Sequence, residues 1–148
     1  MKTSLSLGVR VLAILLATGT NLGCEPAHST GRIRELELPK GFVDKPGDGT
    51  PVTGDLLVMG WALAEGGIED VAIYADGRYV DSAVLGFSRP DVAAAEPGTP
   101  GAATSGFQVL LPAHRLPEGE VILVVQARAQ RGATRDLGAV RVIVPRPQ

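Results

Sequence analysis

The chain has 148 residues, enough for one domain with short appendages, and its formal net charge is −2. This charge gives no electrostatic case for nucleic-acid binding, which requires a basic patch or stripe. Nineteen glycines and eleven prolines are spread between short apolar runs, which is typical of turns between strands.

Residues 1–23 have the layout of an export signal. Lys2 and Arg10 precede a short apolar core at residues 11–17, and small polar residues follow it. The apolar core is shorter than the roughly 20 residues that a membrane-spanning helix needs. Removing residues 1–23 leaves 12 basic and 16 acidic residues, a net charge of −4. We therefore expect an exported, acidic mature chain.

Cys24 directly follows the signal. It is the single cysteine, so it has no partner for an internal disulfide. Gly23 and Cys24 resemble the lipobox of bacterial lipoproteins, although Asn21 stands where leucine is usual and Leu22 comes one place late. The resemblance implies that Cys24 becomes the first mature residue and carries lipid. The alternative is ordinary signal cleavage that leaves a free thiol. Residues 24–40 would form a tether, and 41–148 the domain.

Beyond residue 40 the pattern predicts an all-β domain of about seven strands. Apolar residues alternate with polar ones in short runs separated by turn residues, and no run of twelve shows a helical period. The expected strands are 41–43, 56–63, 68–75, 79–85, 107–111, 121–129 and 137–144. This number and spacing favour an immunoglobulin-like Greek-key β-sandwich over a barrel.

Asp76-Gly77 predicts a two-residue hairpin turn, because both central positions of such a turn need positive φ. Closing the hairpin there pairs Tyr74 with Tyr79 and Ile73 with Val80. One face would then carry Val71, Ile73, Val80 and Val84, and the other Ala72, Tyr74, Tyr79 and Asp81.

In each of the last three predicted strands, every second residue is apolar and is expected to face the core. We expect these side chains in the core: Phe107, Val109 and Leu111; Val121, Leu123, Val125 and Ala127; Val140, Val142 and Val144. The same alternation turns Ile122, Val124 and Ile143 outward, where they give an apolar strip suited to a partner.

The strand at 56–63 is apolar on both alternating faces, so both faces need a cover. One cover is the opposing sheet. We expect the other to be the long connection from Gly86 to Gly106, lying over Trp61. If the outer strip is bare instead, it becomes the best candidate for a binding site.

Four segments together resemble a bacterial Ig-like domain family. They are Gly-Trp-Ala-Leu at 60–63, Val-Ala-Ile-Tyr-Ala-Asp-Gly at 71–77, Arg-Pro-Asp-Val at 89–92 and Ser-Gly-Phe at 105–107. The resemblance covers about residues 41–145, and departs at Glu96, where the family tends to have an aromatic residue. It implies the sandwich fold and an extracytoplasmic setting, but no particular activity.

The connection at 86–106 has three interpretations. It is a lid, with Pro90 and Val92 over Trp61 and Arg89 paired to Asp91 or another carboxylate. Alternatively, Arg89, Asp91 and Glu96 form a polar site beside an aromatic platform, as in a sugar or peptide binder. A third possibility is a metal site, since Asp91 and Glu96 offer hard oxygen ligands, but no calcium-loop motif supports it.

No catalytic constellation is evident, since His28 and His114 are isolated and no nucleophile, zinc or phosphate-loop motif occurs. We therefore expect a non-enzymatic module without cofactor or metal. Its expected role is binding or structural, lipid-anchored at the bacterial cell membrane or outer membrane, or otherwise periplasmic or secreted. Its partner would be a protein or other envelope component, a glycan included. The alternative function is a carbohydrate-binding module of a secreted system that uses Tyr74, Tyr79 and Asp81.

Overall fold

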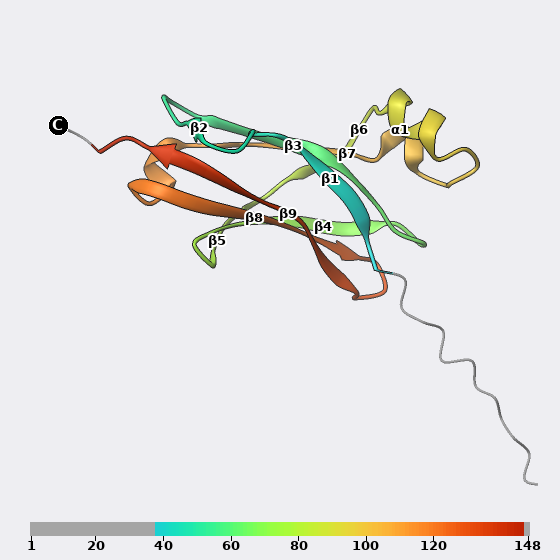
Figure 1. Cartoon of the computed structure of the whole chain (residues 1–148). Coiled ribbons are helices and arrows are strands. Elements are labelled where there is room, and N and C mark those ends of the chain that lie inside the picture. Colours follow the sequence, from blue (N-terminus) through green and yellow to red (C-terminus); the bar gives the residue numbers. More distant parts are fainter. Residues whose placement is uncertain (1–37, 147–148) are drawn as a thin grey trace, which may run out of the picture. The chain divides into compact units, whose positions relative to one another are not determined.

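The computed structural model describes residues 38–146, which form a sandwich of two β-sheets (Figure 1). The predicted signal, Cys24 and the tether as far as residue 37 lie outside the described residues. The elements, in chain order, are β1 (Lys40–Lys45), β2 (Thr50–Pro51), β3 (Leu56–Leu63), β4 (Ile68–Ala75), β5 (Arg78–Ser82), β6 (Val84–Phe87), α1 (Pro90–Ala95), the 3-10 turn η1 (Ala102–Thr104), β7 (Gly106–Leu111), the 3-10 turn η2 (Ala113–Arg115), β8 (Gly119–Ala129) and β9 (Thr134–Val144).

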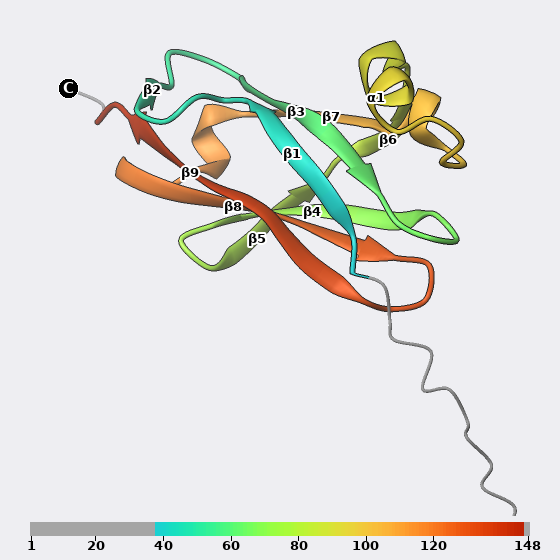
Figure 2. The same cartoon turned by 45° about the vertical axis from the view of Figure 1, so that its right-hand side comes forward.

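The two sheets have the strand orders β1-β3-β7-β6 and β2-β9-β8-β4-β5. All neighbouring strands are antiparallel except β2 and β9, which are parallel. This is the arrangement of an immunoglobulin-like sandwich, in which non-consecutive strands lie side by side within each sheet. The predicted fold class is confirmed. In the described residues, β1 begins at one end of the sandwich and β9 ends at the other (Figure 2).

The core lies between the sheets and follows the predicted alternation. Phe107, Leu111, Val121, Leu123 and Val142 are essentially inaccessible to solvent. Val109 and Val140 are partly buried and pack against the same cluster. Because side chains on a strand alternate between its faces, these inward positions could be read from the sequence.

The Asp76-Gly77 turn is confirmed, with φ of 47° at Asp76 and 79° at Gly77. Tyr74 lies opposite Tyr79 as predicted. The next predicted pair is wrong, because Ile73 lies opposite Asp81 and not Val80, and the register shifts between Ile73 and Tyr74. The bulge adds one residue to β5, and Val80 is buried there.

The predicted strand 79–85 is two strands in different sheets. β5 ends at Ser82, the Ala83 amide donates to the Val71 carbonyl at 2.8 Å, and the chain then crosses to pair with β7 as β6. Val84 is therefore 64% exposed and does not share a face with Val71. In crossing, the chain exchanges β4 for β7 as its hydrogen-bonding partner.

The connection 86–106 contains α1 and η1, which the sequence did not predict. α1 has only six residues, fewer than two full turns, so it leaves no readable helical period. Pro90 occupies the start of the helix, where its missing N–H removes no helical hydrogen bond. Within residues 38–146, no helix is both long and apolar enough to span a bilayer.

Candidate functional site

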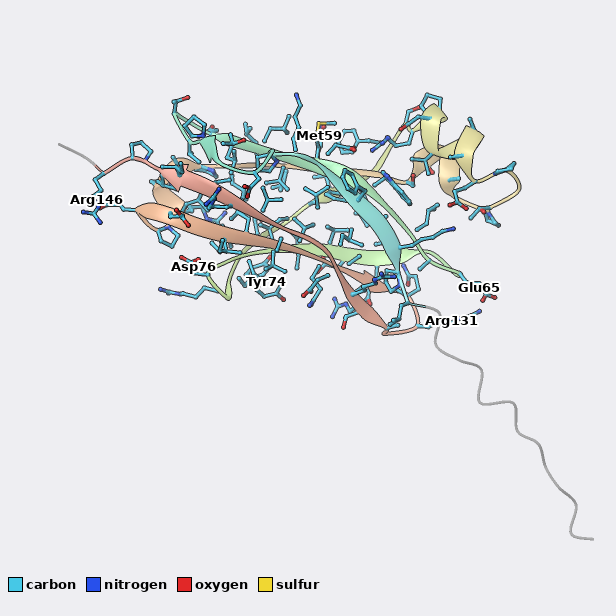
Figure 3. The ribbon with its side chains drawn as sticks, viewed as in Figure 1. Met59, Glu65, Tyr74, Asp76, Arg131 and Arg146 are labelled. Atoms are coloured by element: carbon cyan, nitrogen blue, oxygen red, sulfur yellow. The ribbon has the colours of Figure 1, made fainter. Side chains whose placement is uncertain are left out.

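The outer face of the four-stranded sheet is almost entirely apolar. Strand register places Phe42 opposite Trp61, and Leu57 opposite Leu110. Met59 and Val84 both lie opposite Gln108, and Lys45 lies opposite Met59 on the other side, so polar side chains lie beside this apolar set. Met59 points away from the sandwich on this side (Figure 3). We call this set the apolar face: Phe42, Leu57, Met59, Trp61, Val84 and Leu110.

A lid made of α1 and η1 covers one end of this face. Val92 of α1 and Ala102 of η1 are buried with Leu63, and Trp61 and Ala93 pack against them. Val92 thus packs with Trp61 as the lid interpretation predicted, whereas Pro90, predicted beside it, is not part of this cluster. Pro90 is exposed and starts the helix.

The rest of the apolar face is bare, both at Phe42 beside Trp61 and at the end away from the lid. Phe42 is 59% exposed, Leu110 56% and Val84 64%, whereas Leu57 and Met59 are partly exposed. The prediction that the connection would cover the outer side of β3 therefore holds only for its Trp61–Leu63 end. A six-residue helix is about 9 Å long, which is too short to cover all of an eight-residue strand.

Arg89 fastens the lid to β1. Its guanidinium donates to both carboxylate oxygens of Asp91, at 2.9 and 2.7 Å, and to Asp44 Oδ2 at 2.6 Å. The hydrogen bond to Asp91 is the main cause of a raised Arg89 pKa, and Asp44 adds to it. The same bond lowers the pKa of Asp91 to about 2.

Glu96 forms a second connection to β1, where its carboxylate accepts a 2.7 Å hydrogen bond from Lys40 Nζ. Arg89, Asp91 and Glu96 therefore already have partners within the domain. These contacts are what the lid interpretation expects. Ligand binding by the three side chains stays a prediction.

Acid should weaken the contact between Arg89 and Asp91 in the lid. Asp91 has a pKa below its ordinary value of 3.8, so the stabilisation from its pairing is complete above pH 3.8 and is lost as the pH falls through about 2. We expect the Asp91 carboxyl signal in NMR to titrate near 2. In the Arg89→Gln variant its pKa should be higher, because the largest cause of the lowered pKa is removed. Titration of both proteins at the same pH would contradict this role of Arg89.

Val92→Asp should open the lid, because it places a carboxylate where a 4% exposed side chain now packs near Trp61. Trp61 is the only tryptophan, so its emission should shift to longer wavelength while the far-ultraviolet circular dichroism stays that of a β-sandwich. Ala94→Asp, on the exposed side of the same helix, is the matched control and should leave the emission unchanged. Equal spectra for the two variants would contradict the lid packing.

The two tyrosines lie on the outer face of the five-stranded sheet. Their ring centroids are 6.0 Å apart with an interplanar angle of 74°, an edge-to-face pair. Tyr79 is 59% exposed. Because the rings are nearly perpendicular, only one of them can stack flat on a given sugar ring. Asp81 accepts a 2.6 Å bond from Arg115 Nη1, so it is already paired with a cation.

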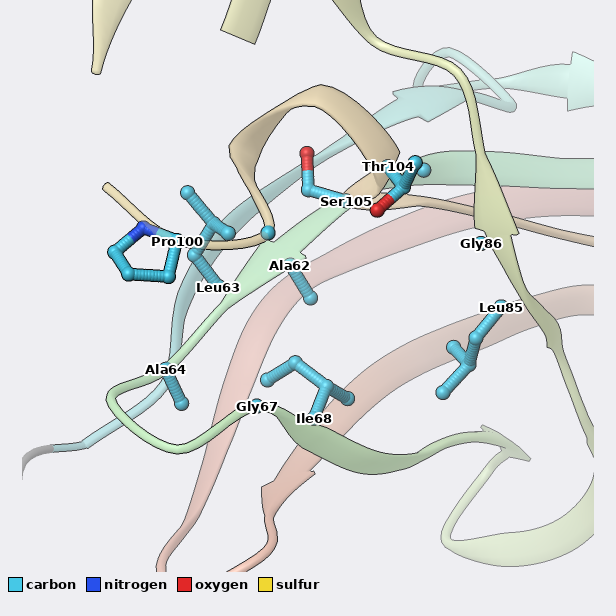
Figure 4. A pocket seen from close by; sticks show the side chains of 12 residues that line it. Ala62, Leu63, Ala64, Gly67, Ile68, Leu85, Gly86, Pro100, Thr104 and Ser105 are labelled. Carbon is cyan, nitrogen blue, oxygen red and sulfur yellow. The ribbon is translucent and has the colours of Figure 1, made fainter. Parts of the chain in front are cut away.

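A hollow of about 240 Å³ opens between the sheets beside the lid (Figure 4). Its walls are glycine and small or aliphatic side chains, and include Ala62, Ile68, Leu85 and Pro100. Thr104 and Ser105 are its hydroxyl-bearing residues, and Ser105 Oγ already donates to the Ala102 carbonyl at 2.8 Å. The hollow therefore holds no titratable group for acid–base chemistry.

Sequence reasoning missed the residues of β1 that complete the site. Asp44 and Lys40 receive the lid's ion pairs, yet they lie 45 and 56 residues from Arg89 and Glu96. Phe42 was seen only as part of a short edge strand. The alternation of exposed Phe42 with buried Val43 was the available signal. Among residues 38–146, no cluster of three or more His, Cys, Asp or Glu could hold a metal ion.

Comparison with solved structures supports the fold. The fibronectin(III)-like modules of CbhA from Clostridium thermocellum match with a TM-score of 0.50 and 16% identity, covering 74% of this chain and 48% of that one. The chain thus spans about half the length of this match. Two weaker matches are CopC from Methylosinus trichosporium OB3b (TM-score 0.40, 16% identity, 73% and 97% coverage) and the Yersinia enterocolitica family 28 exopolygalacturonase (0.35, 15%, 75% and 21%).

No family model matches the chain, and no curated protein matches it in sequence. The structural likeness establishes an Ig-like or fibronectin III-like β-sandwich module and does not extend to function.

Proposed function

We propose that this protein is an exported, lipid-anchored Ig-like module with a non-catalytic binding or structural role at the bacterial cell envelope. The observation that carries the proposal is the part of the apolar face that the lid leaves bare. Three large apolar side chains there, Phe42, Val84 and Leu110, are each more than half exposed. A contiguous apolar surface of this kind on a small domain marks a contact site rather than a catalytic centre.

The charged side chains support a non-catalytic role. Arg89, Asp91 and Glu96, the residues that a polar site would use, are engaged in ion pairs that hold the lid. The hollow beside the lid lacks titratable side chains. An enzyme site instead brings together groups with pKa values suited to proton transfer or nucleophilic attack.

The anchor is supported by the sequence. The predicted signal ends at Gly23, and Cys24 provides the thiol and amine that a lipoprotein acylates. Each buried CH₂ of attached lipid contributes about 0.8 kcal/mol, so several acyl chains on one cysteine hold a protein firmly. A domain that starts near residue 40 would then be held close to the bilayer.

Cys24→Ser should release the protein from the membrane, because it removes the atom that carries the lipid. We expect the parent chain in the detergent-soluble membrane fraction, with an N-terminal peptide that starts at Cys24 and has the added mass of acyl chains. The variant should be in the soluble extracytoplasmic fraction or retain its signal. An unmodified parent N-terminus would refute the anchor.

A second experiment addresses the partners. Cross-linking in intact cells from Leu110 and Ile143, which lie on opposite faces, would identify them.

A further inference from the structure

The two outer faces of the sandwich differ in chemistry. The outside of the five-stranded sheet carries exposed Ile122 and Ile143, turned outward as predicted, together with ion pairs of Arg128 with Glu69 and of Arg141 with Asp48 and Glu120. The opposite face has the uncharged apolar set described above, with Gln108 between Met59 and Val84. A module with ion pairs on one side and larger exposed apolar side chains without ion pairs on the other has a preferred orientation at a boundary between water and an apolar phase.

The charges that border the apolar face are balanced. Lys40 pairs with Glu96, and Arg89 pairs with Asp44 and Asp91. Lys45, opposite Met59, adds one further positive charge at the margin. Residues 38–146 as a whole have ten basic and thirteen acidic side chains, and the six charged residues just named contribute none of this negative excess. An anionic lipid surface would therefore repel this side least.

The tether allows this face to reach a bilayer. Thirteen residues, 25–37, lie between Cys24 and Leu38, where the described chain begins, and the fourteen fully extended steps between the two span at most about 50 Å. The chain then enters β1, whose Phe42 belongs to the apolar face. Either side of the sandwich is within range at this length, so surface chemistry decides which side meets the lipid.

The size of the face favours a tethered contact over a freely diffusing partner. With strands about 4.8 Å apart and a rise of about 3.3 Å per residue, the face covers on the order of 300 Å². Stable protein complexes bury about 800 Å² on each partner. A surface to which the chain is already attached needs less, because the tether supplies a high effective concentration.

We propose that the anchored domain lies on the bilayer with the outside of its four-stranded sheet against the lipid. Phe42, Val84 and Leu110 enter the interface between headgroups and acyl chains. The outside of the five-stranded sheet, with its ion pairs, then points away from the membrane, where other envelope components can reach it. This inference rests on the lipid anchor proposed above.

Two tryptophan substitutions test the orientation. Phe42 and Tyr79 are both aromatic and both 59% exposed, and they lie on opposite outer faces. Phe42→Trp and Tyr79→Trp would each be purified as the cell processes them and reconstituted by the anchor. The probe is a vesicle of phosphatidylcholine and phosphatidylglycerol, with or without phosphatidylcholine brominated near the headgroup end of its chains. Bromine should remove most of the emission added by Phe42→Trp and little of that added by Tyr79→Trp.

Two aspartate variants show whether the apolar face causes the contact. Leu110→Asp, in the Phe42→Trp background, should abolish the quenching, while Ile143→Asp on the opposite face should preserve it. Both positions are about half exposed, so neither change should unfold the domain. Equal quenching of the two tryptophan reporters, or none, in an acylated protein would overturn the orientation and leave the anchor intact. A chain without acyl mass on Cys24 would overturn both.

Discussion

Replacing Gly60 by alanine is expected to lower the free energy of unfolding by about 3 kcal/mol. Gly60 lies in β3 between β1 and β7. A Cβ atom there would lie against the Phe42 carbonyl oxygen and 2.8 Å from the Phe107 ring. The carbonyl belongs to the backbone of the neighbouring strand, so relief requires the strands to move apart. Urea unfolding followed by circular dichroism measures the loss.

Gly54→Ala is the matched control for this prediction. Its Cβ would have no atom within 4 Å, and its φ is not in the left-handed region. The substitution should leave stability unchanged or raise it slightly, because alanine narrows the unfolded ensemble. Equal midpoints for Gly60→Ala and Gly54→Ala would contradict the close approach of the strands. In a double variant, Phe107→Leu should not rescue Gly60→Ala, because it leaves the contact with the Phe42 carbonyl in place.

Local regularity accounts for what the sequence predicted. The bounds of β3 and β4 agree with the predicted strands because turn residues flank both runs. In β8, Val121, Leu123 and Val125 face the core because residues two apart on a strand share a side. The Asp76-Gly77 turn was recognisable because few dipeptides tolerate two consecutive positive φ values.

The features that the sequence could not predict depend on contacts between residues far apart in the chain. After Ser82 the chain leaves β4, its neighbour in the local hairpin, and Leu85 pairs with Phe107 instead, a residue much further along the chain. The same is true of Arg89, whose partner could have been any carboxylate near the lid. How much of the apolar face stays exposed depends on how far the short helix α1 extends over it, and composition alone does not define that.

The motifs behind the sequence resemblance have structural roles in this domain. Gly60 allows the strands to pack closely, Trp61 lies under the lid, and Arg89 fastens the lid to β1. Ser105 donates to the Ala102 carbonyl, and a Cβ on Gly106 would lie 2.7 Å from the Phe87 carbonyl oxygen. Residues with such packing roles indicate the fold and not the function. Phe42, Val84 and Leu110, which carry the functional proposal, lie outside these motifs.

Phe107→Ala is expected to cost about 3–5 kcal/mol, as for other large aromatic side chains truncated in a core. Phe107 is 1% exposed, faces the opposing sheet from β7, and lies opposite both Gly60 and Leu85. Gly60 has no side chain with which to fill the space, so the cavity stays open. Phe107→Leu retains most of the volume and should cost less than half as much. Similar unfolding free energies for the two variants would show that the core collapses around the site. In that case the tight packing inferred at Gly60 would also be wrong.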